Sequence, residues 1–479
     1  MPSKRPIVLI HGYSDKGTSF HAWRDALVAS GDHAPDDVRV CNYQTLTNEV
    51  TIKDLAEGLD WALRRCSGLT GDEPFDAIVH STGMLVVRAW LATYGRRRHR
   101  LKHLIGLAPA TWGSPLAHKG RSWLGALVKG NDQWGPDFME AGDLVLDGLE
   151  LASRFTWDLA HLDFFAPEPA GDDAAAPASP APVFFGPDGD TPHAFIFCGT
   201  AGYPGLLALI NEPGTDGTVR LAGVSLDSRK IILDLARDPA HHPGDRIRKI
   251  GPRGGVDFPM YPVRGADHSS ILAAPPPELV DLVRRALAVE SAADFDAWTA
   301  HARAATRPAF DGLDQWQHFV VRAVDERGDP ITDYHVQLTS HDARGGIFGL
   351  GKGDKAVDLD VHKYAADPSL RSFHLNLTKL YALGPDRLKT LRLRVIASSG
   401  SALVAYHGVN SDKVRADLSK FDSAGKWDAT LDIASLVDDP EVKLFHPWTT
   451  TLIELRLNRD PLPIDRLTPK PLFRFEHER

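Results

Sequence analysis

The most informative stretch of the chain is residues 75–91, which read FDAIVHSTGMLVVRAWL. Residues 75–80 are typical of a strand buried on both faces, and the apolar residues that follow Gly83 are typical of a helix. A serine, Ser81, stands between them. A strand, a serine and a helix in direct succession predict a sharp turn that projects the serine hydroxyl from the edge of a sheet.

The segments around this stretch alternate between strand and helix patterns. Strands are expected at 7–10, 38–43, 101–107, 194–198 and 260–263, and helices at 20–31, 55–63 and 279–289. Such alternation favours right-handed crossovers between parallel strands. It predicts an α/β fold, a doubly wound and mostly parallel sheet with helices on both faces.

Two changes of pattern divide the chain. Residues 112–192 interrupt the alternation with aromatic, helix-compatible segments and a Pro- and Ala-rich stretch, which predicts an inserted cap. From about Trp316, short strands separated by turns predict an all-β sandwich-like domain. We therefore expect an α/β domain over 1–290, a linker over 291–315 and an accessory β domain over 316–479.

Composition excludes several classes of protein. The chain has 479 residues, of which 43% are apolar and 24% are charged, as in ordinary globular proteins. A formal net charge of −9 argues against nucleic acid as a partner. No stretch approaches the roughly 18 apolar residues of a transmembrane helix, and residues 7–10 are too short for a signal-peptide core. The compartment is left open, as cytoplasmic or exported by a non-classical route.

A serine hydroxyl is a poor nucleophile unless a histidine takes its proton and a carboxylate orients that histidine. Two downstream loops supply candidates. Asp216 lies in a tight loop beyond the strand 194–198, and His268 directly follows the strand 260–263. The order Ser, Asp, His is that of a nucleophile elbow with its two partners. Asp227 and Asp234 are the alternative carboxylates, because Asp216 also fits a plain Asp-Gly turn.

A reaction at an acyl carbonyl also needs backbone N–H donors for the oxyanion. Gly12 and Tyr13 follow the first strand, so the Tyr13 amide is one expected donor, and the Thr82 amide is the other. Val79 stands where a glycine is usual in such a turn. Its branched side chain must find room against the neighbouring strands.

These segments together resemble the α/β-hydrolase lipases and esterases, in particular bacterial lipases and lecithin:cholesterol acyltransferase-like enzymes. The resemblance covers residues 1–290 only. It rests on four motifs, which are IHGY at 10–13, HSTG at 80–83, DGTV at 216–219 and DHS at 267–269.

The resemblance implies a role for each residue of the proposed triad. Ser81 would be the nucleophile, His268 the general base and then the general acid, and Asp216 the orienting carboxylate. It also implies an apolar lid over an acyl-chain site. Trp112, Trp123 and Trp134 are candidates for lining that site, with burial in an extended core as the equal alternative.

The remaining charged and thiol groups suggest little chemistry. The basic run 96–100, with Lys102, is expected to be a solvated face, with contact to anionic lipid headgroups as the alternative. Cys41, Cys66 and Cys198 match no metal spacing and are expected as buried thiols. We expect no metal and no cofactor.

The sequence therefore predicts a serine-dependent carboxylic ester hydrolase that acts on lipid-like substrates through an acyl-enzyme. Two alternatives stay open. One is an acyltransferase that uses the same triad with an alcohol as acceptor. The other is a non-catalytic interaction protein with a degenerate hydrolase domain, which the unusual Val79 would favour.

Overall fold

The computed structural model consists of two compact units. The first unit comprises Met1–Ser228, Gly251–Gln315 and Trp448–Thr450, and the second comprises Arg229–Ile250, Trp316–Pro447 and Thr451–Arg479. The described residues are 5–461 apart from 13–16, 42–48, 66–68, 95–97, 120–142, 166–182, 187–190, 237–246, 256, 341–354, 358, 402, 409–426 and 439–442.

A six-stranded parallel sheet forms the centre of the first unit. Its order is β2 (Val38–Cys41), β1 (Ile7–Ile10), β3 (Phe75–His80), β4 (Leu101–Leu107), β5 (His193–Gly199) and β8 (Met260–Val263). Every neighbouring pair is parallel. All residues of β1, β3, β5 and β8 are buried, as expected for strands covered on both faces.

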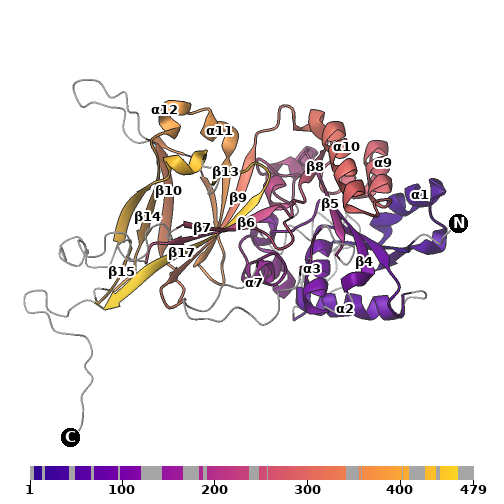
Figure 1. The fold of residues 1–479 in the computed structure, drawn as a ribbon, viewed down its shortest axis with the longest axis horizontal. Coiled ribbons are helices and arrows are strands. Elements are labelled where there is room, and N and C mark those ends of the chain that lie inside the picture. Colours follow the sequence, from indigo (N-terminus) through magenta and orange to yellow (C-terminus); the bar gives the residue numbers. More distant parts are fainter. Residues whose placement is uncertain are drawn as a thin grey trace, which may run out of the picture. The chain divides into compact units, whose positions relative to one another are not determined.

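Helices cover both faces of this sheet (Figure 1). On one face lie α1 (His21–Ala29), α9 (Pro277–Ala286) and α10 (Ala292–Phe310), and on the other lie α2 (Ile52–Arg65) and α3 (Gly83–Thr93). Helix α2 buries Leu55, Leu59 and Leu63 at the spacing expected of an amphipathic helix. The predicted doubly wound parallel sheet is confirmed.

Helix α10 occupies most of the segment expected to be a linker. Ser291 caps it by accepting a hydrogen bond from the amide of Asp294. Phe295, Trp298 and Ala302 are buried along one side, and the Trp298 ring packs edge-on against Phe195 of the sheet at a centroid distance of 4.5 Å. This apolar stripe attaches the helix to the first unit.

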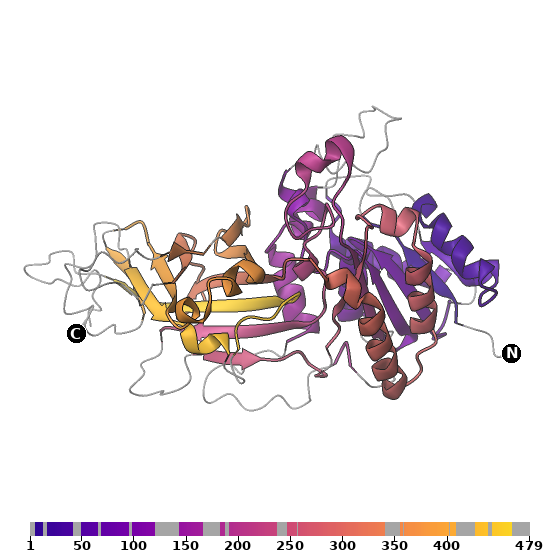
Figure 2. The same cartoon turned by 90° about the horizontal axis from the view of Figure 1, so that it is seen from above.

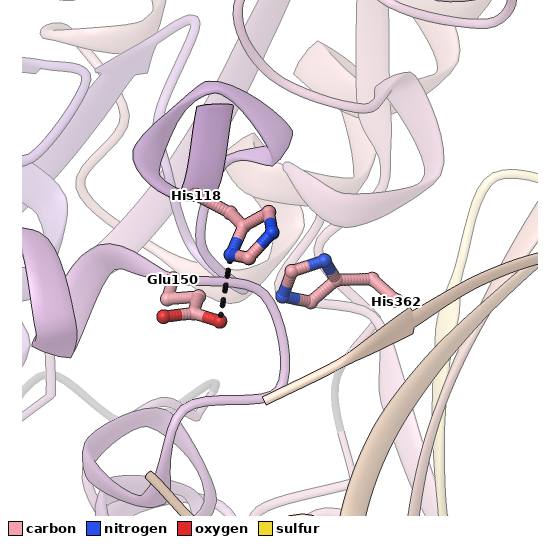
Figure 3. A group of neighbouring side chains, drawn as sticks. All are labelled: His118, Glu150 and His362. Carbon is pink, nitrogen blue, oxygen red and sulfur yellow. Dashed lines mark ion pairs between the residues drawn. The ribbon is translucent and has the colours of Figure 1, made fainter. Parts of the chain in front are cut away.

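The region expected to be a cap contributes three described helices. They are α4 (Pro115–Lys119), α6 (Asp143–Leu149) and α7 (Arg154–Asp163). Nδ1 of His118, in α4, lies 3.5 Å from the carboxylate of Glu150, the residue directly after α6 (Figure 3). The third side chain drawn there, His362, belongs to the second unit.

The second unit contains two sheets. One has the order β11 (Lys355–Ala356), β10 (Tyr334–Ser340), β14 (Leu391–Ala397) and β16 (Trp427–Asp432). The other runs β12 (Leu359–Lys363), β13 (Leu370–Asn376), β9 (Trp316–Asp325), β17 (Thr450–Pro461), β6 (Ser228–Asp234) and β7 (Ile247–Ile250), with β15 (Val404–His407) also paired to β17. Apolar residues of both sheets share one core, so the expected C-terminal β domain is confirmed.

Strands β6 and β7 were not expected from the sequence. They form an antiparallel hairpin that extends a sheet of the second unit, in which β6 is the neighbour of β17 and β7 is the neighbour of β6 (Figure 2). On one face of β6, Lys230 pairs with Glu454 at 2.9 Å, and on the other face Leu233 packs against the core. The segment 229–250 therefore belongs to the β domain although it lies within the predicted α/β domain.

Two side chains differ from their expected environment. Arg100, part of the basic run, is buried because its guanidinium donates to the carbonyls of Glu73 and Leu69. Cys198 is buried as expected, whereas Cys41 is half-buried because β2 is an edge strand, and Cys66 lies outside the described residues.

None of the described helices is long and apolar enough to cross a membrane.

Candidate active site

Ser81 occupies the turn between β3 and α3 in a strained backbone conformation. Its φ is +52°, a left-handed value that costs a non-glycine residue about 1–3 kcal/mol. The surrounding structure holds this conformation, because the Ser81 amide donates to Leu107 O at 3.2 Å and its carbonyl accepts from the amide of Ala110 at 3.0 Å. Ser81 is 8% exposed, so only a small part of the residue reaches the surface.

Glycines allow the turn to close. A Cβ at Gly12 would lie 2.8 Å from Cβ of Ser81, and a Cβ at Gly83 would lie 2.8 Å from the carbonyl oxygen of Ile10. Val79 finds room because its partner on the neighbouring strand β4 is Gly106, which offers no side chain. The branched residue in the usual glycine position is therefore compatible with the sharp turn.

His268 and Asp216 meet at the carboxyl edge of the same sheet. His268 Nδ1 lies 2.9 Å from Asp216 Oδ2, and the His268 amide donates to the Asp216 carbonyl at 3.0 Å. Both side chains are buried, with Asp216 fully enclosed. This geometry fits a carboxylate that orients an imidazole by accepting its Nδ1 proton.

The carboxylate of Asp216 also accepts hydrogen bonds from three other groups. Its Oδ1 accepts from the amides of Thr218 at 2.9 Å and Val219 at 2.8 Å. Its Oδ2 accepts a weak hydrogen bond from the thiol of Cys198 at 3.6 Å. Burial, and then the negative charge of Asp216, raise the pKa of Cys198 well above its usual value, so the thiol remains protonated and can donate.

His80 connects the serine turn with the histidine loop. Its Nε2 lies 2.9 Å from the His268 carbonyl, and the two imidazole centroids are 4.7 Å apart. Burial, and then the charge of His268, lower the pKa of His80 well below 6.5. His80 is therefore neutral, and it carries its proton on Nε2 because only a donor can bind a carbonyl oxygen.

Of the two residues expected to donate to the oxyanion, the structure describes only Thr82. Thr82 is fully buried directly before α3, at the positive end of the helix dipole. Tyr13 lies outside the described residues. Its neighbour Gly12 lies close to Ser81, because a Cβ at Gly12 would be 2.8 Å from the Ser81 Cβ.

Of the three tryptophans expected at the acyl site, the structure describes only Trp112. Trp112 is 1% exposed, donates from Nε1 to Ser225 O and lies 5.3 Å from the Arg88 guanidinium. Arg88 in turn forms a fully buried ion pair with Asp163 at 2.7 Å. Trp112 thus packs in the interior of the first unit. Trp123 and Trp134 lie outside the described residues.

Sequence reasoning did not identify Cys198 as a neighbour of the Asp216–His268 pair. Cys198 lies near the carboxyl end of β5, where loops of the site begin, and this position was the available signal. Neither unit, taken by itself and over its described residues, gathers three His, Cys, Asp or Glu side chains within reach of one metal ion.

Comparison with known proteins relates this architecture to solved structures. No protein-family model and no curated protein sequence matches the chain. The structure is similar to that of phospholipase PlaB from Legionella pneumophila, with a TM-score of 0.73 and 20% identity over 98% of this chain and 99% of that chain. A second structure of PlaB, in complex with thio-NAD, matches with a TM-score of 0.72, 20% identity and the same coverage.

The first unit has the α/β-hydrolase fold. The likeness extends through the β domain, because nearly the whole of both chains is covered. In the α/β-hydrolase fold, reactive groups lie on loops at the carboxyl ends of the strands. Ser81, Asp216 and His268 follow β3, β5 and β8 at these ends.

Proposed function

We propose that this protein is a serine-dependent carboxylic ester hydrolase that acts on lipid-like substrates. The observation that carries the proposal is the buried Asp216–His268 pair beside the strained turn of Ser81. A non-glycine residue held at positive φ between a strand and a helix is a recurrent feature of reactive sites. The likeness to a phospholipase supports the choice of a lipid ester as substrate.

In the proposed reaction, Ser81 Oγ attacks the acyl carbonyl while His268 Nε2 takes the hydroxyl proton. Asp216 stabilises the resulting imidazolium and keeps it in the correct orientation. The amides of Thr82 and Tyr13 stabilise the oxyanion, and His268 then returns the proton to the leaving alcohol. Water attacks the acyl-enzyme with His268 as base and releases the carboxylic acid.

Replacing Ser81 with Ala should lower kcat on p-nitrophenyl esters by about 10⁶-fold, because the nucleophile and its base act as a unit. The matched control is Ser30→Ala, at the end of α1, which should leave kcat unchanged. Unchanged hydrolysis by the Ser81→Ala protein would refute the assignment. A fluorophosphonate probe should label the native chain and not the Ser81→Ala protein, which separates an enzyme from a non-catalytic scaffold.

The substrate class needs a separate measurement. Activity on short esters, triglycerides and phospholipids distinguishes an esterase, a lipase and a phospholipase, and we expect phospholipids to be cleaved. Adding an alcohol and analysing the products distinguishes hydrolysis from acyl transfer. Formation of an ester rather than a free acid as the main product would favour the acyltransferase alternative.

A further inference from the structure

A cavity of about 80 Å³ lies between the two sheets of the second unit. All of its lining residues are apolar, and they come from both sheets, with Val321 and Phe373 on one side and Leu338 and Val395 on the other. The cores of folded proteins normally pack as densely as organic crystals, so a void here sacrifices contacts between side chains. Cavities with purely apolar linings stay dry and accept apolar ligands.

The cavity approaches the protein surface at several points. Val336, Leu359, Leu393 and Leu444 line it and are only partly buried. A single layer of side chains therefore separates the cavity from solvent at these points. A narrow ligand can enter by displacing these side chains without unfolding the sheets.

Three basic side chains lie on or next to segments that contribute to the lining of the cavity. Arg229 lies on the same face of β6 as the lining residue Leu233, because alternate residues of a strand share a face. Lys249 is paired with Ile231 across the β6–β7 hairpin and so shares this face.

The third charge, Lys443, directly precedes Leu444 in the chain. We refer to Arg229, Lys249 and Lys443 as the cationic edge. All three act on His446, whose Nε2 contacts the Lys443 carbonyl at 2.9 Å. Burial, and then the charges of the cationic edge, lower the pKa of His446 to about 4. His446, on which all three charges act, directly follows the lining segment 444–445 in the chain.

We propose that the cavity and the cationic edge bind the anion of a fatty acid. The end of the alkyl chain lies between the sheets, and the carboxylate lies at Lys249 and Lys443. The lining excludes a polar headgroup because it offers no hydrogen-bonding partner. The volume is roughly half that of the ~150 Å³ cavity that admits benzene in another protein, which suits one unbranched chain end. This site belongs to the second unit alone and does not depend on the proposed ester hydrolysis.

The test is calorimetric titration of the full chain with dodecanoate below its micelle-forming concentration. We expect saturable binding, and we expect the combined substitution Lys249→Gln and Lys443→Gln to weaken it at least 10-fold. Lys389→Gln is the matched control, because it removes the same charge from an exposed position outside the strands, and it should leave the affinity unchanged. Dodecyltrimethylammonium, with the same chain and the opposite charge, should bind at least 10-fold more weakly.

A second variant fills the cavity. Val321→Leu combined with Val395→Leu adds one methylene from each sheet and should weaken dodecanoate binding at least 10-fold. If this variant does not melt cooperatively, it is not folded, and the proposal is then tested by the affinity of the Lys249→Gln and Lys443→Gln variant alone. Unchanged affinity in the lysine variant, equal binding of the cationic amphiphile, or binding to phosphatidylglycerol vesicles with none to dodecanoate would each overturn the proposal.

Discussion

His80 links two parts of the candidate site that lie far apart in sequence. It precedes Ser81 directly, and its Nε2 donates to the carbonyl of His268. The ring is neutral because burial keeps its pKa well below 6.5. A neutral donor at this place positions the backbone of His268 without adding a positive charge that would disfavour the imidazolium of the proposed reaction.

We predict that His80→Phe lowers kcat on a p-nitrophenyl ester roughly 10-fold and leaves KM nearly unchanged. The phenylalanine leaves a buried carbonyl without its donor, which costs about 1–3 kcal/mol. His80→Gln is the matched control, since its amide nitrogen can restore the hydrogen bond and most of the rate. Equal losses of kcat in both variants would show that shape, rather than the hydrogen bond, matters at this position.

The depressed pKa of His80 also predicts how stability depends on pH. Below about pH 6.5 the unfolded chain binds a proton at this histidine, whereas the folded chain does not. The free energy of unfolding should therefore fall as the pH is lowered from 7 towards 5. The melting temperature of His80→Gln should fall less over this range than that of the native chain, while that of His335→Gln, changed at an exposed histidine, should follow the native curve.

Among the helices and strands, the sequence predicted those that a local pattern of apolar residues marks. Strands β3, β4 and β8 have the predicted bounds because each is a short, largely apolar run that ends at the site or at a turn. Strands β6 and β7 were missed because β17, the partner of β6, lies more than two hundred residues further along the chain. Local pattern carries no sign of such a pairing.

The same limit applied to the candidate site. The order of Ser81, Asp216 and His268 and their places after strands were visible in the sequence, and the structure brings Asp216 and His268 into contact. The contacts of His80 and Cys198 were not visible, because they depend on how loops from different strands cross the carboxyl edge of the sheet. Trp112 shows that aromatic richness alone does not separate a ligand pocket from a core.

Helices α3 and α7 provide a prediction about packing. Arg88 and Asp163 form a bidentate ion pair at 2.7 and 3.1 Å with no exposed side-chain surface. Asp163→Leu should lower the melting temperature of the first unit strongly, because an unpaired buried arginine costs about 3–5 kcal/mol. The double variant with Arg88→Met should recover much of this loss, since it leaves no unpaired charge. A double variant as unstable as the single one would indicate that the pair is needed for more than neutralisation.

The two units of the chain do not follow one another in sequence, because each is made of several separate stretches. It leaves the first unit after Ser228, adds β6 and β7 to the sheet of the second unit and returns at Gly251. It then continues in the first unit to Gln315, enters the second again at Trp316 and returns to the first only for Trp448–Thr450. Each unit is consequently built from separate stretches of sequence, and a cut between 290 and 316 does not separate them.

This arrangement predicts how truncated proteins behave. A fragment ending at residue 315 keeps β6 and β7 but loses β17, so a two-stranded hairpin with an apolar face is left without its sheet. Isolated hairpins are marginally stable, and exposed strand edges promote aggregation. We therefore expect this fragment to be largely insoluble on expression.

The matched fragment also ends at residue 315 but has 229–250 replaced by a short Gly/Ser linker. The linker can be short because Lys230 and Ile250 are paired across the hairpin, which holds its two ends close together. This fragment should be soluble and monomeric in size-exclusion chromatography, with a cooperative melting transition. Equal solubility of the two fragments would contradict the assignment of residues 229–250 to the β domain, because the hairpin would then be stable without β17.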